Sequence, residues 1–169
     1  MKVGVLAVGN RFAGDDAVGP LVLDAVRPDL PTGVVAAELD GESTRILEAW
    51  EGLDGVVLVD AASAGAPVGT VHRVVEVAAT DPRRPRAPAG TRIAVAQPGR
   101  RRSTHGAGVA DALGLARVLG RLPTEVVIIG VEGTRFSPGA GVSDEVVHAV
   151  PRAVRAVLAE VARLRGVAA

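Results

Sequence analysis

Five acidic residues and one histidine of this sequence have the types and positions that a hydrolytic metal site would need. The acids stand beside short apolar runs and the histidine begins a helical pattern; they are Asp15, Asp16, Asp40, Asp60, Glu132 and His105. Carboxylate oxygens combined with one imidazole nitrogen suit a divalent transition metal such as Zn²⁺ or Ni²⁺. The same donor set fits metal-assisted hydrolysis. These six residues are therefore the first candidates for chemistry.

The elements predicted around these residues place them at one edge of a sheet. Apolar runs at residues 2–8, 34–39 and 56–59 predict buried strands, and helical spacing follows the first two, at 15–26 and 43–50. This alternation is typical of an α/β sheet with right-handed crossovers. Ligands in such sheets bind beyond the carboxyl ends of the parallel strands, so we expect the acids to meet at that edge.

The middle of the chain predicts a change of strand direction. Residues 61–68 are too few for a helical crossover, so the strand predicted at 69–77 should run antiparallel, at or near the sheet edge. Residues 80–104 are rich in proline and arginine and predict an irregular loop, in which 91–96 could form a short strand or an extended segment. We interpret the arginines as solvated; docking of an acidic partner is the simplest functional alternative.

The last third of the sequence returns to the alternating pattern. A helix is expected from His105, then a buried strand at 125–131, then a closing helix with Ser143 as its N-cap. Pro151 is expected to kink that closing helix or to split it in two. No internal repeat or second boundary interrupts the pattern, so we predict a single α/β domain over residues 1–169 with a mostly parallel sheet.

Each candidate residue also has a purely structural interpretation. Asp15 and Asp16 could simply cap a helix and complement its dipole. Asp40 precedes a glycine and could be an ordinary turn residue, and His105 alone could be a residue that begins a helix. Asp60 is harder to explain in this way, because a buried strand end rarely carries an unpaired acid. The functional interpretation therefore rests on the coincidence of these residues at one edge.

Other features of the sequence are assigned no chemistry. Residues 9–14 have the spacing of a phosphate loop, but two aspartates follow where lysine and serine or threonine are needed. Ser63 follows a strand, yet neither the glycine nor the helix of a nucleophile elbow accompanies it, which disfavours a serine hydrolase. His72 and His148 have no acidic neighbours in the pattern, so we interpret both as structural.

Composition excludes several classes of protein. Nineteen basic and nineteen acidic residues give a net charge of zero, which argues against nucleic-acid and anionic-membrane binding. The chain has no cysteine, so thiolate metal sites and cysteine nucleophiles are ruled out. No apolar stretch approaches the roughly 20 residues of a membrane span, and no export signal is evident. We therefore expect a cytoplasmic protein.

Four stretches of the chain resemble the motifs of one family, the hydrogenase maturation proteases. Residues 8–19 (VGNRFAGDDAVG) are similar to the family's G-N-x-L-x-x-D-[DE]-x-x-G, and 39–41 to its D-G-G turn. Residues 57–61 resemble its strand-end aspartate, and 103–113 its helix-start histidine. These endopeptidases trim the C-terminal extension from the large subunit of nickel–iron hydrogenases. The resemblance implies a mixed, twisted sheet of about five strands with helices on both faces.

The resemblance also implies a metal-contacting set. The family's three metal contacts match Asp16, Asp60 and His105, which in the family recognise nickel already inserted into the precursor subunit. Nickel would thus arrive with the substrate, and no tightly bound resident cofactor is expected. Together with Asp40, which we expect to assist proton transfer or to position the substrate tail, these residues form the predicted catalytic set.

Substrate contacts are expected at Gly9, Asn10 and Gly41, within the matched motifs. The chain departs from the family pattern at Glu42, where glycine is frequent, and at Phe12, where leucine is usual. The expected partner is a hydrogenase large-subunit precursor, processed by a monomer. The alternatives are another peptidase on the same scaffold and a non-catalytic protein that recognises a metallated partner.

Overall fold

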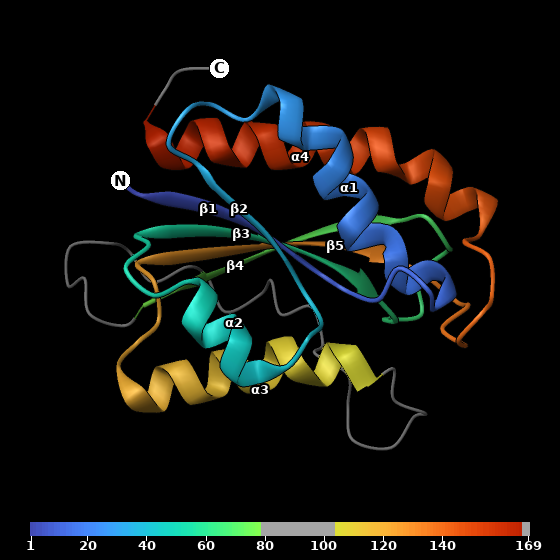
Figure 1. Ribbon diagram of the computed structural model, residues 1–169, viewed down its shortest axis with the longest axis horizontal. Helices are drawn as coiled ribbons and strands as arrows, with labels where there is room; N and C mark the ends of the chain where they lie inside the picture. The colour runs from blue at the N-terminus through green and yellow to red at the C-terminus, as the bar shows by residue number, and fades with distance from the viewer. Residues whose placement is uncertain (79–103, 167–169) are drawn as a thin grey trace.

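The computed structural model describes residues 1–78 and 104–166, without the side chains of 104–107. Its centre is one five-stranded sheet (Figure 1). In spatial order the strands are β2 (Val35–Leu39), β1 (Val3–Val8), β3 (Gly55–Ala62), β5 (Glu125–Glu132) and β4 (Val71–Val77). The strands pair in parallel except β4, which runs antiparallel to β5 at the edge. The predicted direction and position of β4 are therefore confirmed.

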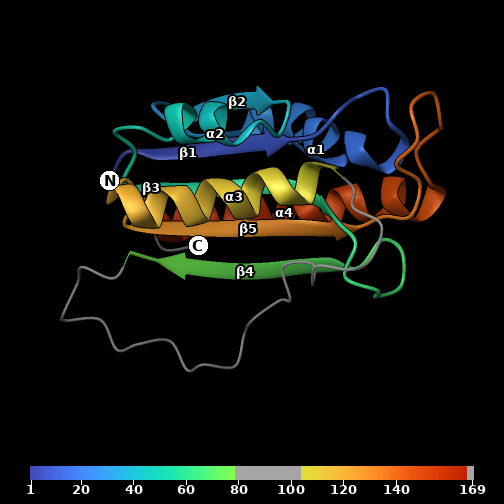
Figure 2. The same ribbon diagram turned by 90° about the horizontal axis from the view of Figure 1, so that it is seen from below.

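Helices cover both faces of the sheet, as expected. Helices α1 (Val18–Val26) and α4 (Asp144–Arg165) lie on one face, and α2 (Ser43–Ala49) and α3 (Thr104–Leu119) lie on the other (Figures 1 and 2). Two short 3₁₀ helices, η1 (Gly14–Ala17) and η2 (Arg27–Asp29), flank α1. The predicted α/β class, with a mostly parallel sheet, is confirmed. The candidate strand at 91–96 lies outside the described residues.

The sheet separates two apolar cores, as its sequence requires. Every residue of β1 is buried, because alternate side chains pack against helices on opposite faces. Val5 contributes to the core beneath α1 and α4, whereas Leu6 contributes to the core beneath α2 and α3. The continuous apolar runs of the sequence thus reflect a central sheet that is covered on both sides.

Strands β3 and β5 extend further than the sequence predicted. The two strands stay paired as far as Ala62 and Glu132, whereas apolarity alone ended them at 59 and 131. Asp60 and Glu132 therefore lie inside strands and not beyond them. The backbone ladder continues through these residues because it depends on main-chain hydrogen bonds and not on side-chain polarity.

Helix α4 is continuous through Pro151, so of the two expected outcomes, a kink or a division into two helices, the division does not occur. A proline removes one main-chain donor, but buried residues on both sides of it, including Val146 and Val157, fix the helix to the sheet.

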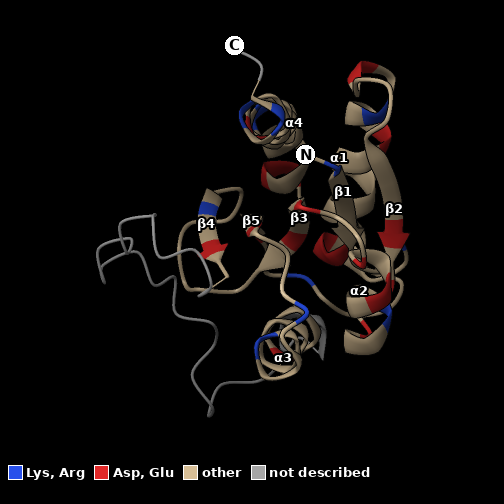
Figure 3. Cartoon of the chain, turned by 90° about the vertical axis from the view of Figure 1, so that its left-hand side faces the viewer, with Lys and Arg blue, Asp and Glu red and all other residues tan. Residues whose placement is uncertain are grey.

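The arginines of α4 and β4 help to hold these elements in place. Arg73 of β4 and Arg163 of α4 both donate to Glu160, at 2.5 and 2.7 Å. Figure 3 shows charged residues of both signs on these two elements.

None of the described helices is both long enough and apolar enough to cross a membrane.

Candidate functional site

The first matched motif forms the turn between β1 and η1, and its glycines make that turn possible. Gly9 follows β1 with a φ of +144°, and a Cβ at this position would overlap the main-chain oxygen of Asp16. A Cβ on Gly19 would overlap the oxygen of Val8 and lie 2.9 Å from that of Val59. The glycines therefore let η1 and the first turn of α1 lie directly against the carboxyl ends of β1 and β3.

Asp16 and Asp60 are the two acids that this packing brings together. Both are buried, at 1% and 6% exposure. Asp16 accepts a hydrogen bond from the Asn10 amide at 2.7 Å, and Asp60 accepts one from the Ala61 amide at 2.8 Å. Burial raises the pKa of Asp60 to about 8, and the negative charge of Asp16 contributes in the same direction. Two buried carboxylates so close to each other form a place where a cation would be strongly favoured.

Asp15, the neighbour of Asp16, serves a different purpose. Its carboxylate accepts hydrogen bonds from the amides of Thr134, Arg135 and Ser143, and from the Ser143 hydroxyl, at 2.7–2.9 Å. Burial by itself would raise the pKa of Asp15, but these hydrogen bonds hold it below its ordinary value. Asp15 thus anchors the loop between β5 and α4. Its role is structural, but it does not cap a helix as the sequence interpretation suggested.

Ser143 occupies the predicted N-cap position of α4, but its hydroxyl caps nothing. The hydroxyl donates to Asp15 at 2.8 Å instead. Ser143 therefore stands at the predicted N-cap position, but its side chain does not cap the helix, because a buried carboxylate competes for the same hydroxyl. The sequence offers no local signal for this bond, since the two residues are 128 positions apart.

Asp40 lies at the same edge of the sheet but remains exposed. Its side chain is 55% exposed and forms an ion pair with Arg45 at 2.8 Å. The residues around it form a shallow pocket of about 320 Å³, lined by Gly9, Asn10, Arg11, Phe12, Glu38 and Asp40. Phe12, where the family usually has leucine, is 80% exposed beside this pocket. Three predicted site residues, Gly9, Asn10 and Asp40, therefore share one concave surface.

Gly41 is buried, unlike Asp40, and it packs against α3. A Cβ on Gly108 would overlap the main-chain oxygen of Gly41. This contact sets the turn after β2 against the first turns of α3. His105 lies in the first turn of that helix, and Figure 2 shows this end of α3 at the carboxyl ends of β1 and β5. Its position at the helix start agrees with the prediction, while its side chain is outside the described part.

The predicted metal triad remains a prediction. Asp16 and Asp60 share a buried location, and the helix that carries His105 begins at the same edge. Among the residues whose side chains are described, no three acidic or histidine side chains are grouped so that they could hold a metal ion. The side chains of Asp16 and Asp60 are thus described, whereas the side chain of His105, the third predicted contact, is not.

Glu132 lies at the predicted edge of the sheet, but its carboxylate is hydrogen-bonded to residues outside the candidate site. It is 2% exposed, and it accepts the Gly65 amide at 2.7 Å and contacts His72 Nε2 at 3.0 Å. His72 therefore does have an acidic neighbour, contrary to the sequence interpretation. The register explains the omission: His72 lies opposite Gly130 across the antiparallel pair, so Glu132 is its diagonal neighbour on the same face. His148 is exposed on α4.

Arg11 is a residue of this edge that sequence reasoning did not select. Its guanidinium contacts Asp24 of α1 and Glu38 of β2, each at 2.7 Å. The arginine thereby ties the loop after β1 to two neighbouring elements and shapes one wall of the pocket beside Asp40. No signal in the sequence identified it, because its two partners are 13 and 27 positions away.

A sequence model of a family described as hydrogenase maturation protease (HycI) matches residues 88–160. No curated protein sequence matches the chain.

Several solved structures are similar over nearly the whole chain. The hydrogenase maturating endopeptidase HybD from Escherichia coli is 26% identical, with a TM-score of 0.73, over 98% of this chain and 94% of its own. The solution structure of an endopeptidase from Escherichia coli is 25% identical, with a TM-score of 0.78, over 99% of this chain and 95% of its own. The [NiFe] hydrogenase maturation protease HybD from Thermococcus kodakarensis is 26% identical, with a TM-score of 0.70, over 95% of this chain and 99% of its own.

Proposed function

We propose that this chain, whose fold and family match are those of the hydrogenase maturation proteases, removes the C-terminal extension from a nickel–iron hydrogenase large-subunit precursor. The resemblance predicted from the sequence motifs is confirmed by these matches, which are to hydrolases of peptide bonds. The substrate, the metal and the roles of single residues are our proposal for this chain.

One observation carries the proposal: the buried Asp16–Asp60 pair at the carboxyl edge of the sheet. Burial, together with the negative charge of Asp16, raises the pKa of Asp60 to about 8, so that Asp60 holds a proton at neutral pH. A nickel ion carried by the precursor would supply the compensating charge, and Asp60 would release its proton as the ion arrives. Carboxylates with one imidazole, from His105, suit Ni²⁺ as a donor set. The nickel is part of the substrate, and we expect no resident cofactor.

The exposed pocket beside Asp40 is the proposed seat of the substrate tail. Gly9 and Asn10 line it with main-chain groups and a short amide, while Phe12 offers an exposed apolar surface. Asp40 is accessible and exposed to solvent, which suits proton transfer or positioning at the scissile peptide. Gly41, being buried, would act through the shape of the turn that it forms with α3.

The partner and setting follow from the same proposal. The partner is the large-subunit precursor, and a single copy of the chain would process it in the cytoplasm. The equal numbers of acidic and basic residues disfavour nucleic acid and anionic membranes as further partners.

The decisive experiment is intact-mass analysis of the cognate precursor. The precursor is prepared with and without nickel and incubated with the wild-type chain, Asp16→Asn or Asp60→Asn. Asp29→Asn is the matched control, because Asp29 is exposed in η2, away from the site. Circular dichroism of each variant verifies that it is folded.

The proposal expects loss of one defined C-terminal peptide, only from the nickel-loaded precursor, with the wild type and the control. A stable complex without any change in mass would identify a non-catalytic binding protein instead. Cleavage that ignores nickel and survives Asp16→Asn would retain the peptidase but reject this account of its site.

A further inference from the structure

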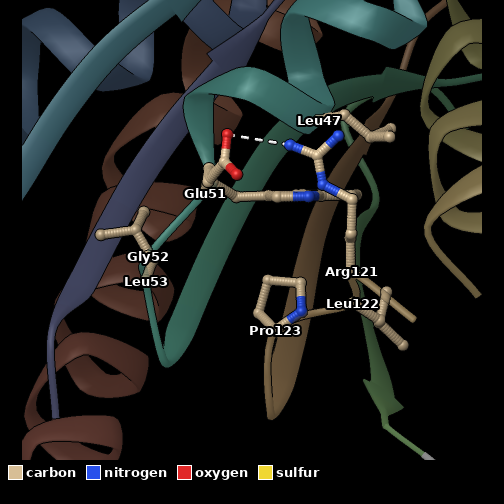
Figure 4. Close-up of a pocket in the computed structure, with 8 residues that line it drawn as sticks. Leu47, Glu51, Gly52, Leu53, Arg121, Leu122 and Pro123 are labelled. Atoms are coloured by element: carbon tan, nitrogen blue, oxygen red, sulfur yellow. Dashed lines mark ion pairs between the residues drawn. The ribbon is translucent and has the colours of Figure 1, made fainter. Parts of the chain in front are cut away.

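A second pocket lies at the opposite end of the sheet from the candidate site. It is about 250 Å³ in volume, between the C-terminal end of α2 and the turn from α3 to β5 (Figure 4). Its lining residues are Leu47, Trp50, Glu51, Gly52, Leu53, Arg121, Leu122 and Pro123. None of these residues has a part in the proposed peptidase, so an inference drawn here is independent of that function.

Trp50 gives this pocket an unsatisfied hydrogen-bond donor. It is the single tryptophan of the chain and is 1% exposed. Among the described residues, no acceptor lies within hydrogen-bond distance of its buried indole Nε1. A buried donor without a partner costs about 1–3 kcal/mol, and such groups in native proteins call for an explanation. The pocket that Trp50 lines is the place from which an acceptor could come.

The remaining walls combine hydrocarbon side chains with polar groups, which include one ion pair. Leu53, Leu122 and Pro123 offer hydrocarbon surface. Glu51 and Arg121 join the two sides of the pocket at 2.8 Å (Figure 4), with side chains that are 66% and 42% exposed. An exposed pair of this kind contributes only about 0–1 kcal/mol. It is therefore the part of the wall that can open at the lowest cost.

The charge balance of the pocket selects the type of ligand. Glu51 neutralises Arg121, so the pocket has no net charge of its own. Helices α2 and α3 both end beside it, and the C-terminal end of a helix carries partial negative charge. An anion would be repelled by these helix ends, and a cation would meet the indole N–H with the wrong polarity. A neutral molecule with one acceptor oxygen fits both conditions.

We propose that this pocket binds a small neutral aliphatic carbonyl compound. The carbonyl oxygen accepts the hydrogen bond of the Trp50 indole, and the aliphatic body lies against Leu53, Leu122 and Pro123. Because the indole nitrogen is buried, the ligand gains access by parting the exposed Glu51–Arg121 pair. Binding satisfies a donor that has no acceptor among the described residues, and it removes apolar wall surface from water.

The experiment uses the indole N–H resonance of the full-length chain in a ¹⁵N-correlated NMR titration. The chain has one tryptophan, so this resonance needs no assignment. The probe is isobutyramide, with isobutyrate and isobutylammonium as charged molecules of similar shape and isopentane as a molecule without an acceptor. We expect a saturable downfield shift with isobutyramide, and a dissociation constant of roughly 1–10 mM. The other three probes should bind at least about tenfold more weakly.

Variants test the assigned contacts. Trp50→Phe removes the donor but keeps an aromatic body, and methyl resonances of the leucines should report about tenfold weaker binding of isobutyramide. Arg121→Gln opens the ion pair, and binding should be retained or strengthened. Arg117→Gln is the matched control, because Arg117 lies on α3 in a comparable pair with Glu76, and it should change nothing.

Two results would overturn the proposal. One is an equal or non-saturating response to all four probes, which would indicate solvent effects on the resonance. The other is an indole proton that already contacts a long-lived bound water and is unmoved by isobutyramide, since water would then be its partner. Comparison with isopentane keeps the test conclusive even if Trp50→Phe does not fold.

Discussion

Asp15 and Asp60 are buried carboxyl groups at the same edge of one sheet, and they differ in charge state. Asp15 accepts three main-chain amides and one hydroxyl from residues 134–143, and its pKa is lowered. Asp60 accepts the amide of Ala61 and faces the charge of Asp16, and its pKa is raised to about 8. Both side chains are buried, but the pKa values of their carboxyl groups are shifted in opposite directions.

The difference teaches that burial alone does not identify a functional acid. The number of hydrogen-bond donors around the carboxylate distinguishes the two acids. At Asp15 the protein supplies all the compensation for a negative charge, so the residue holds a loop and needs nothing further. At Asp60 the protein supplies little compensation and adds a second carboxylate. Such a site is completed by something from outside, which on our proposal is the nickel of the precursor.

The largest loss of stability on substitution is expected from removing the well-compensated acid. Asp15→Ala leaves three amides and one hydroxyl without their acceptor, and it should lower the free energy of unfolding by roughly 3 kcal/mol or more. Urea unfolding measures this change, with Asp29→Ala as an exposed control expected within about 0.5 kcal/mol. A loss below about 1 kcal/mol would show that the hydrogen bonds to Asp15 contribute little to stability.

The pH dependence of stability should distinguish the two acids by sign. The folded-state pKa of Asp60 is raised from 3.8 to about 8, so its contribution is fully present below about pH 4 and disappears as the pH rises through 8. In metal-free protein this gives a fall of up to about 1.4 kcal/mol per pH unit within that window. Asp60→Asn should abolish the fall and make the variant the more stable protein at pH 8.

Asp15 should give the opposite slope at lower pH. Its pKa is lowered in the folded state, so its contribution is present above its ordinary value and is lost as the pH falls through the folded value. Denaturant unfolding between pH 3 and 9 measures both slopes. A wild-type profile identical to that of Asp60→Asn would contradict the raised pKa of Asp60.

Glu132 extends the comparison to an acid that is compensated by only two partners. Glu132→Gln keeps an acceptor for the Gly65 amide but loses the charge that faces His72, so about 1 kcal/mol of stability should be lost. Hydrogen exchange of the Gly65 amide should quicken at the same time. Glu76→Gln, in an exposed ion pair with Arg117, should leave that exchange rate unchanged.

The smallest effect on stability is expected at the exposed acid of the edge. Asp40→Asn removes one partner of an exposed ion pair, which should alter the free energy of unfolding by less than about 0.5 kcal/mol. Precursor processing should nevertheless slow markedly, since the proposal gives Asp40 a role at the substrate tail. Processing at the wild-type rate, measured by intact mass, would remove Asp40 from the catalytic set.

Much of the fold was accessible from the sequence because its signals are local. The periodicity of apolar residues identified the strands and helices, and the short connection at 61–68 predicted the antiparallel direction of β4. The strand ends were less accessible, because the β3–β5 ladder continues through Asp60 and Glu132. The continuity of α4 through Pro151 was not accessible either, since it depends on packing on both sides of the proline, which no local rule describes.

The sequence predicted where the candidate site lies, but not the different roles of its acidic residues. Sequence alone brought Asp15, Asp16, Asp40 and Asp60 to one edge, because the carboxyl ends of parallel strands meet there. It could not separate Asp15 from Asp16, which are adjacent in the chain. The separation depends on donors that are 119–128 positions from Asp15.

The sequence by itself thus determined the order and kind of the elements, the edge at which chemistry is placed and the family motifs, all of which follow from spacing along the chain. Only the tertiary structure decided which acid is held charged and which is held protonated, that Glu132 contacts His72, and that Trp50 has no acceptor within the described part of the chain. These outcomes depend on how many donors and charges distant segments bring to one buried atom, and that number is fixed only when the segments pack together.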